Sequence, residues 1–224
     1  MHPLLVLFDL DNTLVDRQGT VSDWAAEFTS RYGLEDEEQV DVLGKVVERA
    51  YPSTFGAIRI RYRLPMSTAE LWRAYCADIA AMVSCPTEVL DGLDELRASG
   101  WRVGVATNGA ADIQRAKLQA TGISEHVDGL FVSEEADARK PHTRHFALAA
   151  ARCGTVLGDG GWMVGDNPVN DIGGARSAGL QTIWIGNGRS WPLDDPGPDH
   201  MVPHARAAID LLLLHSADHT RTTT

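Results

Sequence analysis

Short apolar runs alternate with helical patterns along most of the chain. The apolar runs are LLVLF near the N-terminus and, much later, WRVGVAT, GLFV, GWMVG and QTIWIG. Helical patterns span residues 110–121, 142–152 and 171–178, in the intervals between the later apolar runs. A glycine, which favours a helix end, lies just beyond each of these helical patterns. Strands and helices that alternate at this spacing predict an α/β fold in which helices cover both faces of a parallel sheet.

The interval between the first and second apolar runs carries helical patterns only. Thr20-x-x-Asp23 and Ser67-x-x-Glu70 are typical of capping boxes at helix starts. Helical spacing collects two apolar sets on single faces, namely Val40, Leu43, Val46 and Val47 in one helix and Leu71, Tyr75, Ile79 and Met82 in another. We therefore expect residues 16–87 to form an all-helical insertion in an α/β core made of residues 1–15 and 88–224.

One segment of this insertion, AIRIRYRLP, has arginine at alternate positions. If the segment is extended, Arg59, Arg61 and Arg63 point the same way, because side chains alternate across a strand. Two interpretations stay open: a solvated face, or a site for an anionic group of a ligand.

The composition narrows the class of protein. The chain has 224 residues, 44% of them hydrophobic, and a formal net charge of −11. No apolar run approaches the roughly 18 residues that cross a bilayer, and no basic segment of a signal peptide precedes the first run. An acidic chain without a basic surface argues against nucleic-acid partners. We expect a cytoplasmic protein that handles a small molecule; the sequence does not indicate its oligomeric state.

Polar residues follow the apolar runs at the positions where parallel strands end. They are Asp9 and Asp11 after the first run, Thr107 and Asn108 after the second, Lys140 at a helix start after the third, and Asp166 and Asp171 after the fourth. In open α/β sheets, functional groups gather beyond the carboxyl ends of the strands. We therefore expect these side chains to meet at one edge of the sheet.

The four aspartates in this set need positive charge nearby. Unit charges about 4 Å apart repel by several kcal/mol at an intermediate dielectric, and Lys140 is the one cation among the motifs. An oxygen-rich cluster selects a hard ion such as Mg²⁺. One aspartate can then attack an electrophile while the other moves a proton.

These four motifs, in this order, resemble those of the haloacid dehalogenase (HAD) superfamily, in its phosphatase-like branch. Asp9-Leu10-Asp11-Asn12-Thr13 is similar to motif one and Thr107-Asn108 to motif two. Lys140-Pro141 is similar to motif three, and GDNPVND, with Asp166 and Asp171, to motif four. The resemblance covers the chain up to about residue 186, and it implies a Rossmann-like core with a helical cap at residues 16–87.

The resemblance also implies a role for each motif residue. Asp9 is expected to form an aspartyl-phosphate, and Asp11 to protonate the leaving oxygen and then activate water. Thr107, Asn108 and Lys140 are expected to hold the phosphoryl group. The Mg²⁺ ligands implied are the Asp9 side chain, the Asp11 carbonyl and Asp166, with Asp171 acting through water. The predicted protein is a Mg²⁺-dependent phosphatase of a small phosphorylated metabolite.

Several alternatives stay open. Each motif alone is compatible with ordinary turns and helix caps, and Asp171 with a helix cap in particular. A phosphomutase uses the same residues, whereas dehalogenases of the family lack the second aspartate that Asp11 supplies here. A phospho-accepting signalling domain and a catalytically silent binding protein are the non-enzymatic alternatives; the first needs no helical insertion, and the intact Asp9 and Asp11 argue against the second.

Overall fold

The computed structural model describes residues 4–194 and 196–221, with side chains up to residue 216. The described residues form a parallel six-stranded sheet in the order β3-β2-β1-β4-β5-β6. Its strands are β1 (Leu4–Phe8), β2 (Trp101–Thr107), β3 (Gly129–Val132), β4 (Trp162–Gly165), β5 (Gln181–Ile185) and β6 (His200–Val202). The predicted α/β fold and all five predicted strands are confirmed, and β6 is an additional edge strand.

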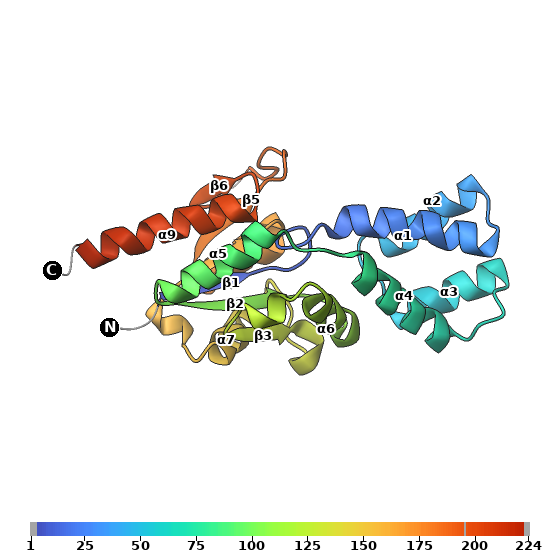
Figure 1. Cartoon of the computed structure of the whole chain (residues 1–224), viewed down its shortest axis with the longest axis horizontal. Helices are drawn as coiled ribbons and strands as arrows, with labels where there is room; N and C mark the ends of the chain where they lie inside the picture. Colours follow the sequence, from blue (N-terminus) through green and yellow to red (C-terminus); the bar gives the residue numbers. More distant parts are fainter. Residues whose placement is uncertain (1–3, 195, 222–224) are drawn as a thin grey trace.

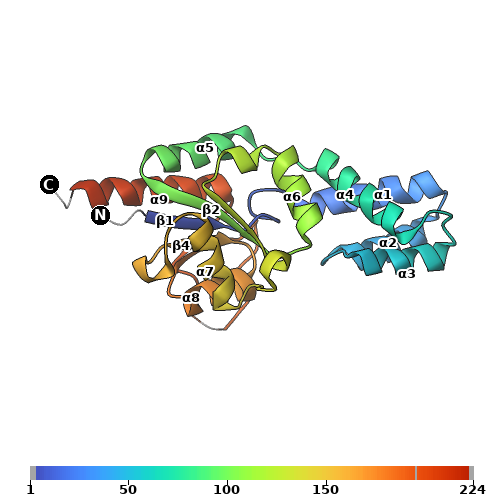
Figure 2. The same ribbon diagram turned by 90° about the horizontal axis from the view of Figure 1, so that it is seen from below.

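Helices cover both faces of the sheet, as Figures 1 and 2 show. Helices α5 (Thr87–Ala98) and α9 (Ala205–Arg221) lie on one face, and α7 (Thr143–Arg152) and α8 (Gly174–Ser177) on the other. Side chains of β1 alternate between the two layers, so Val6 and Phe8 join the core beneath α5 and α9, whereas Leu5 and Leu7 join the core beneath α7. A strand that is buried on both faces explains why its sequence is continuously apolar.

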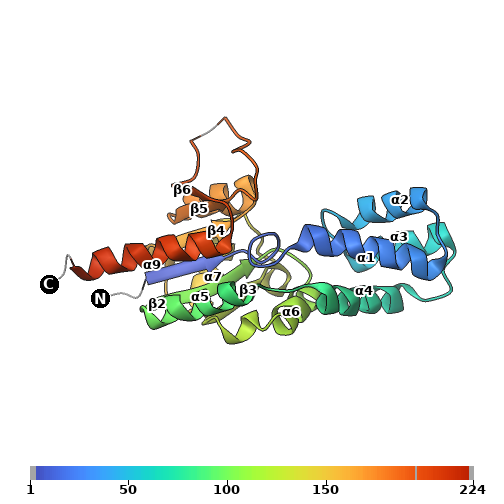
Figure 3. The ribbon, with the colours of Figure 1, turned by 45° about the horizontal axis from the view of Figure 1, so that its top comes forward.

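Four helices form a separate group beyond the carboxyl ends of the strands (Figures 1 and 3). They are α1 (Arg17–Tyr32), α2 (Asp36–Val46), α3 (Pro52–Tyr62) and α4 (Thr68–Met82). Their core is rich in aromatic rings that contact one another, contributed by Trp24, Phe28, Phe55, Trp72 and Tyr75. Helix α6 (Ala111–Ala120) of the α/β core packs against α4, so the helical group rests on the sheet unit at this point.

The two predicted helix starts have different outcomes. Ser67 and Glu70 form the predicted capping box: the Ser67 hydroxyl accepts from the Glu70 N–H at 3.2 Å, and the Glu70 carboxylate accepts from the Ser67 N–H at 2.8 Å. The Thr20 box is wrong. Helix α1 begins one turn earlier, at Arg17, because the Asp16 side chain caps it by accepting from the Gly19 N–H at 2.9 Å.

The buried face of α2 also differs from the prediction. Val40 is 73% exposed, and Val42 and Val46 are the residues that α2 buries in the helical group. Of the second predicted set, Leu71, Tyr75 and Ile79 are buried, as expected, and Met82 is partly buried.

The arginine triplet is not extended, so the condition for a common direction of its side chains is not met, and the segment belongs to the predicted all-helical insertion. Helix α3 includes Arg59 and Arg61, and it begins with Pro52 and buries Phe55 and Ile58, which are three residues apart. Two arginines have local partners: the Arg59 Nε donates to the Met66 carbonyl at 2.7 Å, and the Arg61 Nε lies 3.1 Å from the Asp41 carboxylate.

The segment after β4 is irregular rather than one helix over 171–178. A π-helical turn, η4 (Pro168–Gly173), precedes the short α8. The Asn167 side chain caps this turn by accepting from the N–H groups of Val169 and Asn170. Over the described residues, none of the helices combines the length and apolar character that a membrane crossing requires.

Candidate active site

Asp9 and Lys140 meet at the carboxyl edge of the sheet. Asp9 follows β1 directly, and its N–H donates to the Val164 carbonyl at 2.9 Å, which fixes the end of the strand. Lys140 comes from the loop before α7, and its Nζ lies 2.6 Å from Asp9 Oδ1 and 2.7 Å from Asp171 Oδ1. One ammonium group therefore bridges two carboxylates, and all three side chains are buried.

The residues that follow β2 hold this arrangement in place. The Asn108 side chain accepts from the Lys140 N–H at 2.9 Å and donates to the Lys140 carbonyl at 3.0 Å. Its amide is thus used to fix the backbone of Lys140. The Thr107 hydroxyl oxygen accepts from Gln114 Nε2 at 2.6 Å and is buried beside the same cavity.

Three carboxylates form a cluster of the kind that holds a cation. Asp9, Asp166 and Asp171 each offer an oxygen, and these oxygens lie within 4.8 Å of one another. Asp166, after β4, is also 3.1 Å from the Arg189 guanidinium. Asp171 Oδ2 accepts from the Asn167 N–H at 2.9 Å, so Asp171 both stabilises the π-helical turn and faces the cluster.

The cluster is strained electrostatically. Burial raises the pKa of Asp9 to about 7. Lys140 opposes this shift by attraction, whereas Asp171 and Asp11 add to it by repulsion. Burial and the charge of Asp9 raise the pKa of Asp166 to about 6, although Arg189 opposes the shift. Burial alone would lower the pKa of Lys140, but Asp171 and Asp9 outweigh it and raise that pKa.

The cluster fits a hard divalent cation. Its donors are all carboxylate oxygens, which Mg²⁺ and Ca²⁺ prefer, and its raised pKa values show that negative charge there lacks compensation. A divalent ion would supply that compensation and return the aspartates to their ionised forms.

Asp11 lies in the same cavity, but its carboxylate has different partners. Lys117 Nζ is 2.6 Å from Asp11 Oδ1, Gln114 Nε2 is 3.2 Å from Oδ2, and Arg17 Nε is 3.8 Å from Oδ2. Burial alone would raise the pKa of Asp11, but Lys117 and Arg17 hold it below its ordinary value. Asn12, which follows, has a φ of 57°, a conformation that asparagine tolerates, so the motif also turns the chain.

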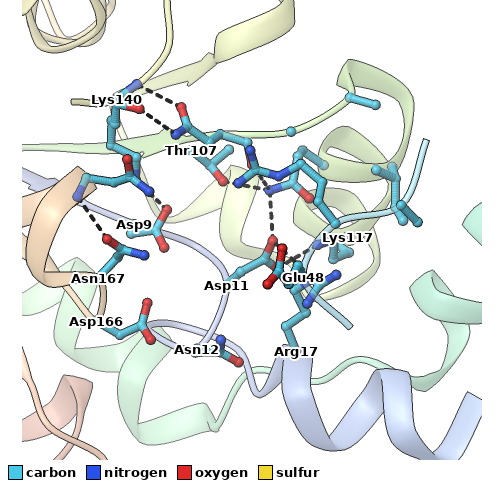
Figure 4. Close-up of a pocket in the computed structure, with 18 of the residues that line it drawn as sticks. Asp9, Asp11, Asn12, Arg17, Glu48, Thr107, Lys117, Lys140, Asp166 and Asn167 are labelled. Atoms are coloured by element: carbon cyan, nitrogen blue, oxygen red, sulfur yellow. Dashed lines mark hydrogen bonds and ion pairs between the residues drawn. The ribbon is translucent and has the colours of Figure 1, made fainter. Parts of the chain in front are cut away.

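These side chains line one cavity of about 150 Å³ (Figure 4). The α/β core contributes all seven predicted site residues, Asp9, Asp11, Thr107, Asn108, Lys140, Asp166 and Asp171. The helical group contributes residues that the sequence did not single out, namely Arg17, Glu48, Arg49, Ala50 and Tyr75. The cavity therefore lies between the two units, and both define its walls.

A family profile covers this whole arrangement. The profile of the haloacid dehalogenase-like hydrolases matches residues 6–185, from β1 to the end of β5, and so includes every predicted site residue and the helical group. The chain belongs to the haloacid dehalogenase-like hydrolases. The resemblance inferred from the four motifs is thereby confirmed.

Two similar proteins that match most of this chain are named as phosphatases. The phosphoserine phosphatase of Thermus thermophilus is 36% identical over 184 residues, which are 82% of this chain and 64% of that protein. The chain thus spans slightly less than two thirds of that relative. The glyceraldehyde 3-phosphate phosphatase of Methanopyrus kandleri is 30% identical over 224 residues, 92% of this chain and 96% of that protein.

Solved structures agree on the fold. The putative HAD-hydrolase YfnB from Bacillus subtilis, whose crystal structure was determined bound to magnesium, superposes with a TM-score of 0.73. The match covers 95% of this chain and 99% of that chain at 19% identity, so it supports the fold alone.

Two site residues of this HAD-like hydrolase escaped prediction although the sequence holds a signal for them. Gln114 and Lys117 occupy the buried stripe of α6 together with Ile113 and Leu118. Polar side chains are costly in such a stripe unless they are paired, so their position itself indicates partners inside the protein. Gln114 donates to Thr107, seven residues earlier, and both Gln114 and Lys117 contact Asp11, which lies far away in sequence.

Proposed function

We propose that this HAD-like hydrolase is a Mg²⁺-dependent phosphatase of a small phosphorylated metabolite and that Asp9 carries the phosphoryl group. One observation carries the proposal: Asp9, paired with Lys140, shares a closed-in cavity with a second aspartate, Asp11, that does not belong to the acidic cluster. The names of the similar proteins, all phosphatases of small metabolites among those above, support the same reaction.

In the first step, an Asp9 carboxylate oxygen attacks phosphorus, and the bond from phosphorus to the ester oxygen breaks. The leaving alkoxide takes a proton from Asp11, so an alcohol departs and an aspartyl-phosphate stays on Asp9. Lys140, 2.6 Å from Asp9, stabilises the negative charge of the phosphoryl oxygens as they approach.

In the second step, water attacks phosphorus of the aspartyl-phosphate, and Asp11 accepts its proton. The bond between phosphorus and Asp9 breaks, which releases inorganic phosphate and restores both aspartates. The ion pair with Lys117 keeps Asp11 ionised, as this basic role requires. Protonation for the first step requires that pair to loosen.

The Mg²⁺ ligands in this proposal are Asp9, Asp166 and Asp171, with the main-chain carbonyl of Asp11 that the family resemblance implies. When bound, the ion neutralises phosphoryl oxygens and keeps Asp9 ionised. Arg189 holds the Asp166 carboxylate on the cluster side at 3.1 Å.

Residues 16–87 act as a cap in this proposal. Ala110 and Ile113 of the α/β core pack in the same apolar cluster as α1 to α4, so the two units share part of a core. In this proposal, the cavity that both units line limits the access of bulk water to the phosphoryl group. The cap residues in its lining determine which substrate binds.

Asp11 also argues for phosphoryl transfer over dehalogenation. A halide leaves without a proton, whereas an alkoxide requires one, so a proton-transfer group in the cavity is useful only for the ester. A phosphomutase would return the phosphoryl group to a sugar, and it is distinguished by whether inorganic phosphate accumulates.

We predict that chelation abolishes phosphatase activity. With p-nitrophenyl phosphate as substrate, excess chelator should reduce turnover at least a hundredfold, and added Mg²⁺ should restore it, because the three clustered carboxylates repel a phosphate dianion. The measurement is release of inorganic phosphate with and without Mg²⁺. Full turnover in chelator would overturn the metal requirement, and release of halide from haloacids without any phosphatase activity would overturn the reaction.

A further inference from the structure

Most charged side chains that line the cavity already have partners. Asp9 and Asp171 pair with Lys140, Asp11 with Lys117, and Asp166 with Arg189. The Arg17 guanidinium donates to the carbonyls of Val46 and Val47 and lies 3.8 Å from Asp11. These groups are therefore occupied in building the site.

Glu48 and Arg49 are the exceptions. Both line the cavity, and neither makes a hydrogen bond or an ion pair with any residue in the described part of the chain, including each other. They are adjacent in the short segment between α2 and α3, so the helical group presents an acid and a base to the cavity from one point. Figure 4 draws Glu48 in the pocket with Asp11 and Arg17.

Their charges are not explained by the phosphoryl chemistry. Glu48 adds a fifth acid to a cavity that already holds Asp9, Asp11, Asp166 and Asp171, and it is the one acid of the five without a cationic partner among the described residues. Glu48 is exposed where it lines the cavity, so solvent weakens its repulsion of a phosphate monoester, and a substrate that brings a positive charge turns that repulsion into attraction. Arg49 is correspondingly free to bind an anion, and guanidinium matches a carboxylate through two parallel hydrogen bonds.

We propose that the substrate is an O-phosphorylated α-amino acid, whose carboxylate is bound by Arg49 and whose ammonium group is bound by Glu48. In an α-amino acid these two groups are attached to one carbon and are close neighbours, and Glu48 and Arg49 are adjacent in the chain and line the same cavity. This inference rests on the proposed phosphatase function and assigns the substrate class of the same site.

The size of the cavity agrees with a short amino acid. Its volume of about 150 Å³ is smaller than the roughly 300–1,000 Å³ of sites for drug-sized ligands. A phosphoryl group with a three- or four-carbon body is the appropriate scale for this volume.

Four small phosphate esters separate the contributions of the two charges. O-phospho-L-serine has both groups, 3-phosphoglycerate has only the carboxylate, phosphoethanolamine has only the ammonium group, and glycerol 3-phosphate has neither. For the parent protein with Mg²⁺, kcat/KM should be highest for phosphoserine and lowest for glycerol 3-phosphate, with roughly a tenfold loss or more for each missing group, as expected for charged hydrogen bonds.

Two variants assign each contribution to its residue. Arg49→Gln should reduce kcat/KM for phosphoserine and 3-phosphoglycerate roughly tenfold more than for the other two esters. Glu48→Gln should do the same for phosphoserine and phosphoethanolamine. Arg63→Gln is the matched control, because Arg63 is an exposed arginine on the same helical group and lies outside the cavity lining, and it should leave all four values unchanged.

The outcomes separate this inference from the proposed function. If the parent hydrolyses p-nitrophenyl phosphate but does not prefer phosphoserine over glycerol 3-phosphate, the function stands and the substrate class is wrong. Equal effects of Arg49→Gln on all four esters would also overturn it. If no ester is hydrolysed with Mg²⁺, the phosphatase proposal fails and the substrate class fails with it. The parent comparison requires no variant, so a folding defect in either substitution leaves the test intact.

Discussion

Lys140 contacts two of the aspartates at the centre of the site. It is 4% exposed, and its ammonium group lies within 2.7 Å of carboxylate oxygens on both Asp9 and Asp171. A buried ammonium of this kind is stable only because both carboxylates outweigh the loss of water, as the raised pKa of Lys140 reflects. In the proposed reaction, the same charge would face the oxygens of the phosphoryl group.

We predict that Lys140→Met slows turnover of p-nitrophenyl phosphate roughly a hundredfold or more, since removal of one preorganised charge contact on a transition state costs about 3–4 kcal/mol. Methionine keeps much of the buried stem, which limits the loss of packing. Steady-state kinetics with Mg²⁺ provide the measurement. Lys45→Met, which removes a partly exposed ion pair with Asp41, is the control and should be nearly neutral. Near-normal turnover of Lys140→Met would assign Lys140 a structural role only.

The raised pKa of Asp9 makes the free energy of unfolding depend on pH. In the metal-free protein its pKa is about 7, against an ordinary value of 3.8, so between these values the folded state holds a proton that the unfolded state has lost. The free energy of unfolding therefore falls as pH rises from about 4 to about 7. Asparagine does not ionise, so the Asp9→Asn protein does not lose this part of its free energy of unfolding as pH rises.

We predict that, in chelator, the melting temperature of Asp9→Asn minus that of the parent increases between about pH 5 and about pH 7.5. The increase should be roughly 2–4 °C for each kcal/mol of unfolding free energy that the parent loses over this range. Loss of the Lys140 contact adds an offset that does not change over this range. Thermal melts followed by circular dichroism measure the difference, and Asp91→Asn, an exposed aspartate on α5, should show no such trend. A difference that stays constant or declines with pH would contradict the raised pKa of Asp9.

At the scale of elements, the sequence predicts the buried strands well and the helical group less well. Strands β1, β2, β4 and β5 are mostly apolar because they are buried on both faces, and Arg102 and Gln181, near the starts of β2 and β5, are their exposed polar exceptions. Strand β6 has three residues, mostly exposed, so no apolar run marks it. Helix α3 falls within the predicted all-helical insertion, but its bounds were not predicted; alternating arginines are compatible with an extended chain, whereas Phe55 and Ile58, three residues apart, fit a helix.

The residues of the candidate site also fall into a predictable and an unpredictable group. Residues that end strands were predictable, because the topology brings the carboxyl ends of parallel strands to one edge. Lys117 and Glu48 were not, because their importance depends on contacts between elements distant in sequence. Lys117 on α6 reaches Asp11, and Glu48 enters the cavity from the helical group. Spacing within α6 places Lys117 on a buried face, but it does not identify Asp11 as the partner.

At the scale of the whole molecule, the proposed function draws on both units. The α/β core supplies the aspartates and Lys140, and the segment between α2 and α3 supplies Glu48 and Arg49 to the same cavity. Contact between α4 and α6 joins the units next to Gln114 and Lys117, which contact Asp11 and Thr107. The contact between the units therefore lies beside the residue that the proposal assigns to proton transfer.

The central claim is that Asp9 receives the phosphoryl group and Asp11 later activates the water that removes it. The direct measurement is mass spectrometry of the Asp11→Asn protein, quenched in acid during turnover of p-nitrophenyl phosphate with Mg²⁺ and then digested. Asparagine keeps the size and the main-chain carbonyl but cannot accept the proton, so hydrolysis of the intermediate should slow roughly a hundredfold or more. We predict that the peptide containing Asp9 gains the mass of one phosphoryl group. The same peptide should stay unmodified when Asp9→Asn is added. An adduct on another residue, or Asp11→Asn turnover equal to that of the parent, would contradict the account.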